Sequence, residues 1–297
     1  AEFAPAWLAV QAMCWLPLPL ARALAGQLAR LLYRVTKRWR AIAERNLEIA
    51  FPDVPQARRQ EILRGSYDNL GRVILALARL PRLNAANIGE WIDYDGFEYF
   101  EQAKRAGKGV LFLTAHLGNW ELSSAAHALY GNPMHVMVRP LDNPLLDRLV
   151  QRRRELFGNH PIAKRDAARD VIRALRANEA VGILADQNAA GDDGVFVDFF
   201  GTQASATRGV AQLAMRTGAA IIPGFAFWNE STGRYVLKFY APIEPRVRAD
   251  REQNVLETTQ RCQSAIERTI RERPEQWLWM HRRWKRRPPG EAPFYSS

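Results

Sequence analysis

The sequence predicts an α/β fold in which a mostly parallel β-sheet is flanked by helices. Three observations lead to this prediction. Short apolar runs of strand length begin near residue 108 and recur along the chain. Segments with the periodicity of amphipathic helices lie between these runs. Strands that alternate with helices in this way form parallel sheets that are covered on both faces.

The N-terminal segment differs from the rest of the chain. No residue from 3 to 21 is charged, and an apolar stretch of that length can cross a bilayer as a helix. Pro17 and Pro19 interrupt the stretch, and a basic series follows it: Arg22, Arg30, Arg34, Lys37, Arg38 and Arg40. We predict that residues 1–36 form a membrane anchor with a basic flank on the cytoplasmic side, either spanning the bilayer or lying in its interface. The alternative is a helix buried in the core.

The remaining elements follow in order. Residues 37–50 and 56–80 are predicted helices, because both are amphipathic and both end at prolines. Five predicted strands come next, at residues 109–115, 134–138, 180–186, 219–228 and 235–240. The helices between them are predicted at residues 120–130, 144–157, 166–177 and 207–217. In such sheets, ligands bind at the carboxyl ends of the strands.

Charge and cysteine usage restrict the class of protein. The net charge of +11 favours a polyanionic partner, which can be nucleic acid, an anionic membrane surface or a phosphorylated substrate. Cys14 and Cys262 are too far apart in sequence to indicate a disulfide framework or a zinc site, and we expect both to be small core or helix-face residues. His127 and His135 match no standard metal spacing with His116, so no metal is predicted.

The chemistry is predicted at the turn that follows the first apolar strand. His116 comes directly after the strand, Asn119 is a good helix N-cap, and Glu121 lies in the first helical turn. A histidine at this place can act as a general base, and a neighbouring carboxylate can orient its ring. Asp186 ends another predicted strand at the same edge and competes with Glu121 for that orienting role.

Other reaction types lack their motifs. The chain has no Gly-x-Ser-x-Gly elbow, no phosphate-binding Gly-x-x-x-x-Gly-Lys-Ser/Thr loop and no Gly-x-Gly-x-x-Gly fingerprint. What remains is direct transfer, in which a base removes the proton of an acceptor hydroxyl and the oxygen attacks an activated carbonyl.

Several motifs together resemble a known family. His-x-x-x-x-Glu after an apolar strand resembles the His-x-x-x-x-Asp/Glu box of glycerolipid acyltransferases. An ordered set of segments is similar to the bacterial lipid A late acyltransferases, the lauroyl and myristoyl transferases. These segments are residues 45–52, 116–121, 138–144, 185–187, 194–201 and 274–288. The resemblance extends over nearly the whole chain and implies a glycerolipid-acyltransferase-like domain at residues 37–297.

The resemblance also implies an activity and a location. The enzyme is expected to act at the cytoplasmic face of a bacterial inner membrane. There it would move a fatty acyl chain from acyl carrier protein, a co-substrate, to a hydroxyl of a lipid A precursor. No cofactor is expected. One alternative acceptor is another phosphorylated glycolipid, such as a mannosylated phosphoinositide. A remote alternative is a membrane-tethered protein that binds polyanions without catalysis.

Residues that bind substrate are carried over by position. Arg139 follows a strand at the active edge, and the fork of an arginine suits a phosphate or a developing oxyanion. Arg154 matches an arginine that the family uses near its site. Asn119 and Gln187 lie within the matching motifs. Arg208 begins a predicted helix, where backbone N–H groups favour anions, although a solvent-exposed role is the alternative.

Two aromatic segments have two interpretations each. Phe196, Phe199 and Phe200 line an acyl groove or belong to the core. The C-terminal segment holds Trp277, Trp279 and Trp284 among basic residues, a composition typical of membrane interfaces. Nucleic-acid binding also uses aromatic and basic side chains, but it does not require the apolar N-terminus. We therefore predict a membrane surface and no nucleic acid as partner.

Overall fold

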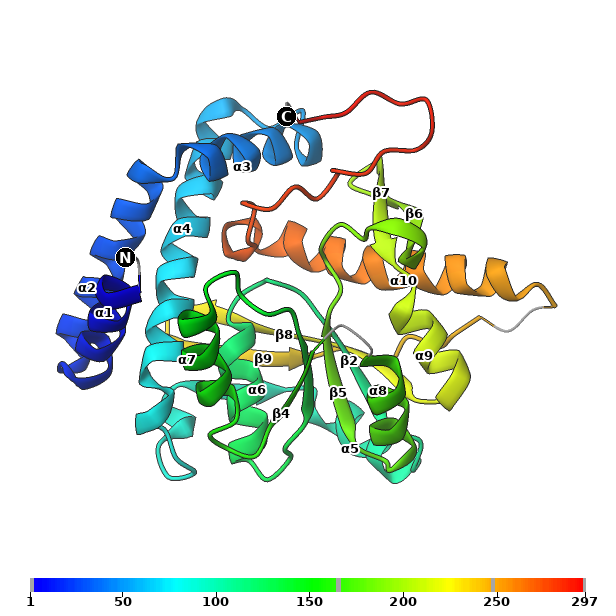
Figure 1. The fold of residues 1–297 in the computed structure, drawn as a ribbon, viewed down its shortest axis with the longest axis horizontal. Helices are drawn as coiled ribbons and strands as arrows, with labels where there is room; N and C mark the ends of the chain where they lie inside the picture. The colour runs from blue at the N-terminus through cyan, green and yellow to red at the C-terminus, as the bar shows by residue number, and fades with distance from the viewer. Residues whose placement is uncertain (1–2, 164–166, 247–248, 296–297) are drawn as a thin grey trace.

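The computed structural model describes residues 3–163, 167–246 and 249–295. Its centre is a seven-stranded sheet in the order β1-β9-β8-β2-β5-β3-β4. Only the β8–β9 pair is antiparallel within this sheet. The predicted α/β fold with a mostly parallel, helix-flanked sheet is therefore confirmed (Figure 1).

Strands β2, β3, β5, β8 and β9 lie close to their predicted places, whereas β1 and β4 were not predicted. The bounds are β1 Ile92–Asp95, β2 Val110–Thr114, β3 His135–Val138, β4 His160–Ala163, β5 Ala180–Leu184, β8 Ala220–Asn229 and β9 Arg234–Phe239. A separate antiparallel hairpin consists of β6 Gly194–Phe199 and β7 Thr202–Thr207. The central strands β2 and β5 are almost entirely buried, which explains their unbroken apolar sequences.

The helices cover the sheet on both faces (Figure 1). Their bounds are α3 Lys37–Ala50, α4 Gln56–Arg79, α5 Phe97–Arg105, α6 Trp120–Leu129, α7 Pro144–Arg154, α8 Ala167–Arg176, α9 Gly209–Thr217 and α10 Arg251–Glu272. The helix predicted to reach residue 157 ends at Arg154, and the predicted helix start at Asp166 lies outside the described residues. Two apolar clusters, one on each face, form the core around these strands.

The N-terminal stretch forms two helices instead of one. Helix α1 spans Phe3–Trp15 and α2 spans Leu18–Val35, and Pro17 lies between them. No helix within the described part of the chain is long and apolar enough to cross a membrane. Pro17 divides the predicted apolar stretch between the two helices, and Pro19 lies in the first turn of α2.

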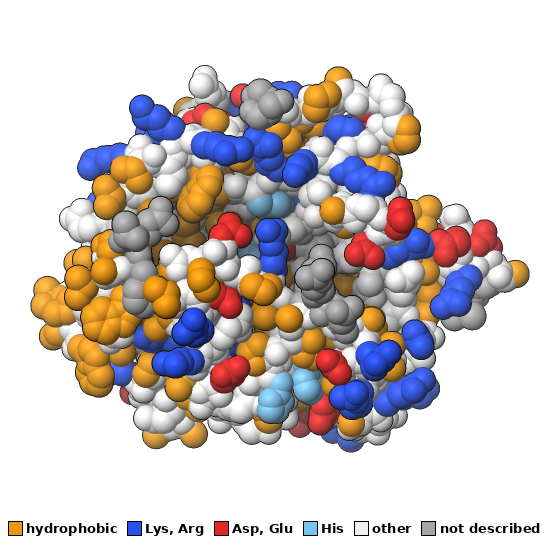
Figure 2. Space-filling model, in the orientation of Figure 1, with side chains coloured by type: hydrophobic (Ala, Val, Ile, Leu, Met, Phe, Trp, Pro, Cys, Tyr) orange, Lys and Arg blue, Asp and Glu red, His pale blue; other side chains and the backbone are white. Residues whose placement is uncertain are grey.

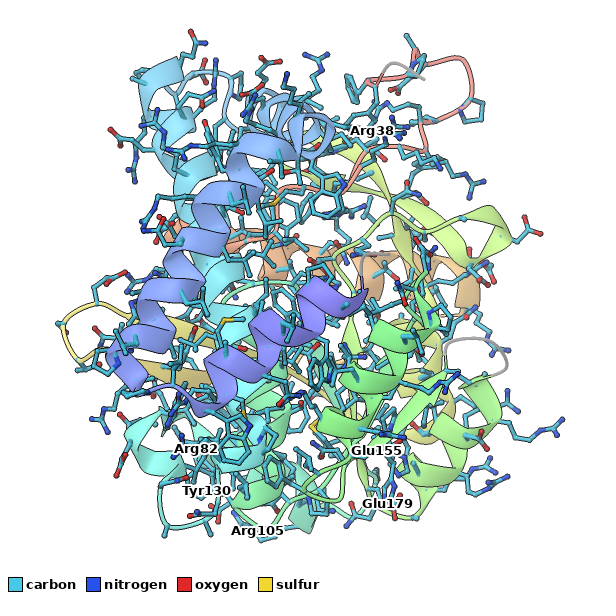
Figure 3. The ribbon with its side chains drawn as sticks, turned by 60° about the vertical axis from the view of Figure 1, so that its left-hand side comes forward. Arg38, Arg82, Arg105, Tyr130, Glu155 and Glu179 are labelled. Atoms are coloured by element: carbon cyan, nitrogen blue, oxygen red, sulfur yellow. The ribbon has the colours of Figure 1, made fainter. Side chains whose placement is uncertain are left out.

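Both N-terminal helices pack on α4. Met13, Ala21 and Ala25 form a small buried cluster with Leu75 and Ala78 of α4. At the end of α1, the Arg82 guanidinium lies 5.8 Å from the centre of the Trp15 ring. Figure 3 shows Arg82 beneath the junction of α1 and α2, with α1 crossing toward α7. The outward sides of both helices remain exposed, including Leu8, Trp15, Leu20, Leu31 and Val35.

Candidate active site

The register of two neighbouring strands brings His116 and Asp186 together. Strands β2 and β5 are parallel, and Thr114 of β2 is paired with Leu184 of β5. His116 and Asp186 each follow these paired residues by two positions, so both reach the carboxyl edge of the sheet side by side. The His116 Nδ1 lies 2.9 Å from Asp186 Oδ1. The backbone N–H of His116 also donates to Asp186 Oδ2 at 2.9 Å.

Asp186 is fully buried and remains ionised. Burial opposes ionisation, but the His116 charge and the hydrogen bonds from His116 and Trp277 outweigh it, so the pKa of Asp186 lies well below its usual range. An ionised carboxylate only accepts hydrogen bonds, so the proton of the neutral imidazole stays on Nδ1. The lone pair on His116 Nε2 is then available to accept a proton, which is the arrangement of a general base.

Glu121 has a different partner. Its carboxylate accepts two hydrogen bonds from Arg154, from Nε at 3.0 Å and from Nη2 at 2.5 Å. Burial lowers the pKa of Arg154, but the hydrogen bonds and charge of Glu121 raise it above its usual value. The geometry therefore gives the orienting position at His116 to Asp186. The competing prediction that Glu121 orients the imidazole is wrong, because Glu121 forms a bidentate ion pair one helix away.

A cavity of about 600 Å³ opens at this edge. Its polar part is lined by His116, Glu121, Arg139, Arg154 and Gln187. The Gln187 side-chain amide lies 3.5 Å from His116 Nδ1. Among the described residues, Arg139 forms no ion pair or side-chain hydrogen bond, so its guanidinium is available to an anionic group.

The inner part of the cavity is mainly apolar. It runs along the sheet past Phe112, Leu237 and Phe239 toward His127. Burial lowers the pKa of His127 to about 3, so its imidazole is neutral at ordinary pH. The His127 Nδ1 lies 3.2 Å from the Tyr94 hydroxyl. A cavity lined by a base and by apolar side chains can hold a hydrocarbon chain with its reactive end at that base.

Two predicted binding residues do not line this cavity. Asn119 is buried, and its side-chain oxygen accepts from the backbone N–H of Leu122, so it caps α6. This capping role replaces the predicted contact of Asn119 with substrate. Arg208 forms an ion pair with Glu252, while its neighbours Thr207 and Gly209 line the cavity. A substrate contact of Arg208 stays a prediction.

The aromatic hairpin belongs to the core. Phe199 and Phe200 are buried in the cluster that also contains Trp277, and neither lines the cavity. Phe196 lies at the surface of the hairpin against Arg286, also outside the cavity. The core interpretation therefore holds for Phe199 and Phe200, and none of the three residues lines the cavity.

Residues of the C-terminal segment contribute to the site without having been predicted there. The Trp277 Nε1–H donates to Asp186 Oδ2 at 2.8 Å, and the Leu278 N–H donates to the His116 carbonyl at 2.9 Å. Trp277, Trp279 and Trp284 are fully buried, so the prediction that these indoles sit in a membrane interface is wrong. Trp277 is 91 positions from Asp186 in the sequence, and no local sequence pattern predicts a contact over that separation.

Over residues 3–163, 167–246 and 249–295, no group of three or more His, Cys, Asp or Glu side chains is arranged to hold a metal ion. Cys14 and Cys262 are buried free thiols, as expected for core residues.

Comparison with known proteins identifies the family. The model of the bacterial lipid A biosynthesis acyltransferase family matches residues 4–286. A lipid A biosynthesis acyltransferase of Haemophilus influenzae is 26% identical over 94% of this chain and 86% of its own length. The lipid A biosynthesis lauroyltransferase of Escherichia coli is 29% identical over 97% and 92%, and the myristoyltransferase is 27% identical over 98% and 90%.

One solved structure also aligns with the chain. It is the 1-acyl-sn-glycerophosphate acyltransferase PlsC of Thermotoga maritima, with a TM-score of 0.40, 13% identity, and coverage of 86% of this chain and 96% of that one. The family match extends over nearly the whole chain and includes both His116 and Asp186. The chain therefore belongs to the bacterial lipid A biosynthesis acyltransferase family and is an acyltransferase of lipid A biosynthesis.

Proposed function

We propose that this enzyme transfers a fatty acyl chain from acyl carrier protein to a hydroxyl of a lipid A precursor, with His116 as general base. The observation that carries the proposal is the His116–Asp186 pair at the mouth of a cavity with an apolar interior. The relatives named lauroyltransferase and myristoyltransferase act with acyl groups of the kind that this cavity suits.

The proposed acyl transfer takes place in two steps at the thioester carbonyl. His116 Nε2 removes the proton of the acceptor hydroxyl as its oxygen forms a bond to the thioester carbonyl carbon. The tetrahedral intermediate then collapses, the carbon–sulfur bond breaks, and the imidazolium returns the proton to the leaving thiolate. Asp186 stays ionised throughout and stabilises the imidazolium.

Arg139 is the proposed anion-binding residue. It lines the mouth of the cavity and has no ion-pair partner among the described residues, whereas the charge of Arg154 is already compensated by Glu121. A free guanidinium can hold a lipid phosphate or the oxyanion of the intermediate by charge-assisted hydrogen bonds. We assign the first of these roles to Arg139 because it lies at the entrance.

The proposed location is the cytoplasmic face of the inner membrane, with α1 and α2 in the lipid interface. Figure 2 shows an apolar area over these helices beside the hollowed centre of the face. Exposed Leu141 and Leu145 extend the apolar surface from the cavity toward α7. Basic residues of α2 and α3 flank it, as they do in helices that lie on anionic membranes.

Mass spectrometry of the reaction products tests the proposal. The purified enzyme is incubated with a lipid A precursor and acyl carrier proteins that bear lauroyl, myristoyl or palmitoleoyl chains. We expect the precursor to gain the mass of one fatty acid less one water. His116→Ala should fold normally and lose about 10²- to 10⁴-fold in turnover, the usual contribution of a general base. Near wild-type turnover of this variant would remove His116 from the mechanism, and acylation only of a mannosylated phosphoinositide would contradict the proposed acceptor.

A further inference from the structure

The chain after α10 packs directly against the turn that carries His116. Figure 1 shows this segment leaving the α4 end of α10 and running back toward β6 and β7. Its backbone holds the turn on both sides of Leu117. The Gly118 N–H donates to the Gln276 carbonyl at 2.9 Å, and the Leu278 N–H donates to the His116 carbonyl at 2.9 Å. The backbone of the turn is thus fixed by this segment.

The side chain of Trp277 continues this contact into the Asp186 carboxylate. Two donors occupy Asp186 Oδ2, the Trp277 indole N–H at 2.8 Å and the His116 backbone N–H at 2.9 Å. The other oxygen, Oδ1, is left to the His116 imidazole at 2.9 Å. With Oδ2 held from two directions, the carboxylate cannot rotate without breaking charge-assisted hydrogen bonds, which are stronger than neutral ones.

The Trp277 ring is itself held in place. It is fully buried and packs edge to face against Trp279, with ring centroids 4.5 Å apart. On another side it meets Phe199 at 6.0 Å. The Trp277 carbonyl accepts a hydrogen bond of 2.6 Å from the Ser66 hydroxyl. The indole N–H therefore has one fixed direction, toward Asp186.

A second connection reaches the same carboxylate through the backbone. Arg283 is fully buried and donates to the Ser205 carbonyl at 2.6 Å and to Gln263 Oε1 at 3.0 Å. The Gln263 amide in turn donates to the Ala185 carbonyl at 2.8 Å, one residue before Asp186. The backbone that presents Asp186 is thus tied to the same C-terminal segment.

We propose that Trp277 is a positioning residue for acyl transfer, whose indole N–H fixes the Asp186 carboxylate so that Oδ1 faces His116 Nδ1. The proposal rests on the proposed role of His116 as general base. Trp277 does not touch substrate; it acts through Asp186. A general base loses effectiveness when its ring orientation or tautomer is no longer fixed, because the reacting geometry is then reached less often.

The test removes only the indole N–H. Trp277 is replaced by β-(3-benzothienyl)alanine, which keeps the shape of the ring and has sulfur in place of the N–H group. A hydrogen bond to a charged group is typically worth about 1.5–3 kcal/mol, which corresponds to a fall in kcat of about 10- to 100-fold. The KM values for both substrates should stay unchanged, since neither substrate contacts the ring.

Trp284 is the matched control. It is also fully buried, in the same apolar cluster, and its Nε1 has no hydrogen-bond partner within the described part of the chain. The same replacement at Trp284 should leave kcat within about twofold, because no polar contact of the indole is lost. Circular dichroism should show both variants folded at the assay temperature, which separates a loss of positioning from a loss of folding.

The tautomer of the His116 imidazole can be measured directly by NMR. The ¹⁵N NMR shifts of the His116 ring should show one Nδ1–H tautomer in the wild type and a mixture of tautomers in the Trp277 variant.

The proposal is overturned if the Trp277 variant keeps both the wild-type kcat and the wild-type tautomer of His116, or if the Trp284 variant loses kcat equally. His116→Ala is assayed in parallel. If His116→Ala retains turnover, the proposed function fails, and the tautomer of His116 alone decides whether Trp277 positions Asp186. If His116→Ala is inactive while the Trp277 variant keeps wild-type kcat and tautomer, only the positioning role of Trp277 fails.

Discussion

Two carboxylates lie near the first corner of the sheet, and their partners distinguish their roles. Glu121 sits in the first turn of α6, where the helix N-terminus favours negative charge, and pairs with Arg154. Asp186 sits in a fully buried position between His116 and Trp277. The first pair joins α6 to α7, and the second orients the base. Glu121 therefore does not orient His116, and it contributes to the wall of the cavity.

We predict that Glu121→Gln lowers stability. The substitution leaves the Arg154 guanidinium, only 14% exposed, without its paired carboxylate. The loss should be about 2 kcal/mol, below the range for fully buried pairs because solvent reaches part of the guanidinium. Urea unfolding of the variant measures it. Glu155→Gln, an exposed neighbour, is the control and should change stability by less than about 0.5 kcal/mol. Equal midpoints for both variants would show that the Glu121–Arg154 pair adds nothing.

The candidate catalytic residues could be predicted from the sequence to the extent that they follow strands. His116 and Asp186 each come directly after an apolar run, and the edge of a parallel sheet collects such residues. Which carboxylate contacts the imidazole depends on the β2–β5 register, which a single sequence does not encode locally. The contact of Trp277 depends on the path of the chain after α10, and for that reason its burial was not predictable.

At the scale of elements, the turn between β2 and α6 depends on Gly118. Its φ is +63°, in the left-handed region, and a Cβ at this position would overlap the Ala226 carbonyl oxygen. The neighbouring backbone cannot move away, because the Asn119 N–H donates to the same carbonyl at 2.8 Å. The turn that presents His116 thus needs a residue without a side chain.

We predict that Gly118→Ala prevents normal folding or abolishes turnover. Both the left-handed φ and the overlap with the Ala226 carbonyl must be relieved by moving the turn away from β8. Gly107 is the matched control, since its φ of +73° is similar and nothing lies within 4 Å of a Cβ built there. Gly107→Ala should cost only about 1 kcal/mol of backbone strain. Circular dichroism and the acylation assay measure both variants; similar behaviour of the two would contradict the role of the Ala226 contact.

The sequence predicted the buried central strands better than the edge strands and the polar helix α10. Strands β2 and β5 stand out as unbroken apolar runs, because both of their faces are covered. The edge strands β1 and β4 were not predicted, since β1 alternates with aspartates and β4 contains Pro161, which an edge strand tolerates. Helix α10 was also missed, because its apolar positions are widely spaced among polar residues.

At the scale of the whole molecule, the active cavity and the apolar surface lie beside each other. The cavity mouth is lined by Leu141, and α7 and α1 continue outward from it with exposed apolar side chains. An interfacial position of α1 and α2 would place the mouth near the lipid headgroups. A lipid acceptor could then reach His116 without leaving the membrane surface.

We predict that the triple substitution Trp7→Ser, Leu8→Ser, Trp15→Ser weakens membrane binding. Leu8 and Trp15 are 60% and 70% exposed, so their loss removes apolar area from the surface without opening the core. Co-sedimentation with anionic vesicles should show binding weakened by more than about tenfold, as expected for three apolar side chains at about 25 cal/mol per Å². Circular dichroism should show the wild-type fold. Vesicle binding equal to that of the wild type would rule out α1 as the membrane contact.

The most direct test of the account compares Asp186→Asn with Glu121→Gln in single-turnover acyl transfer, at a temperature where both variants are folded. Asp186→Asn keeps the size of the side chain but can impose the wrong imidazole tautomer, and we expect a loss of about 10²- to 10⁴-fold in rate. Glu121→Gln should lose less than about tenfold, because its carboxylate does not contact His116. Full activity of Asp186→Asn, together with a loss in Glu121→Gln as large as that of His116→Ala, would contradict the account.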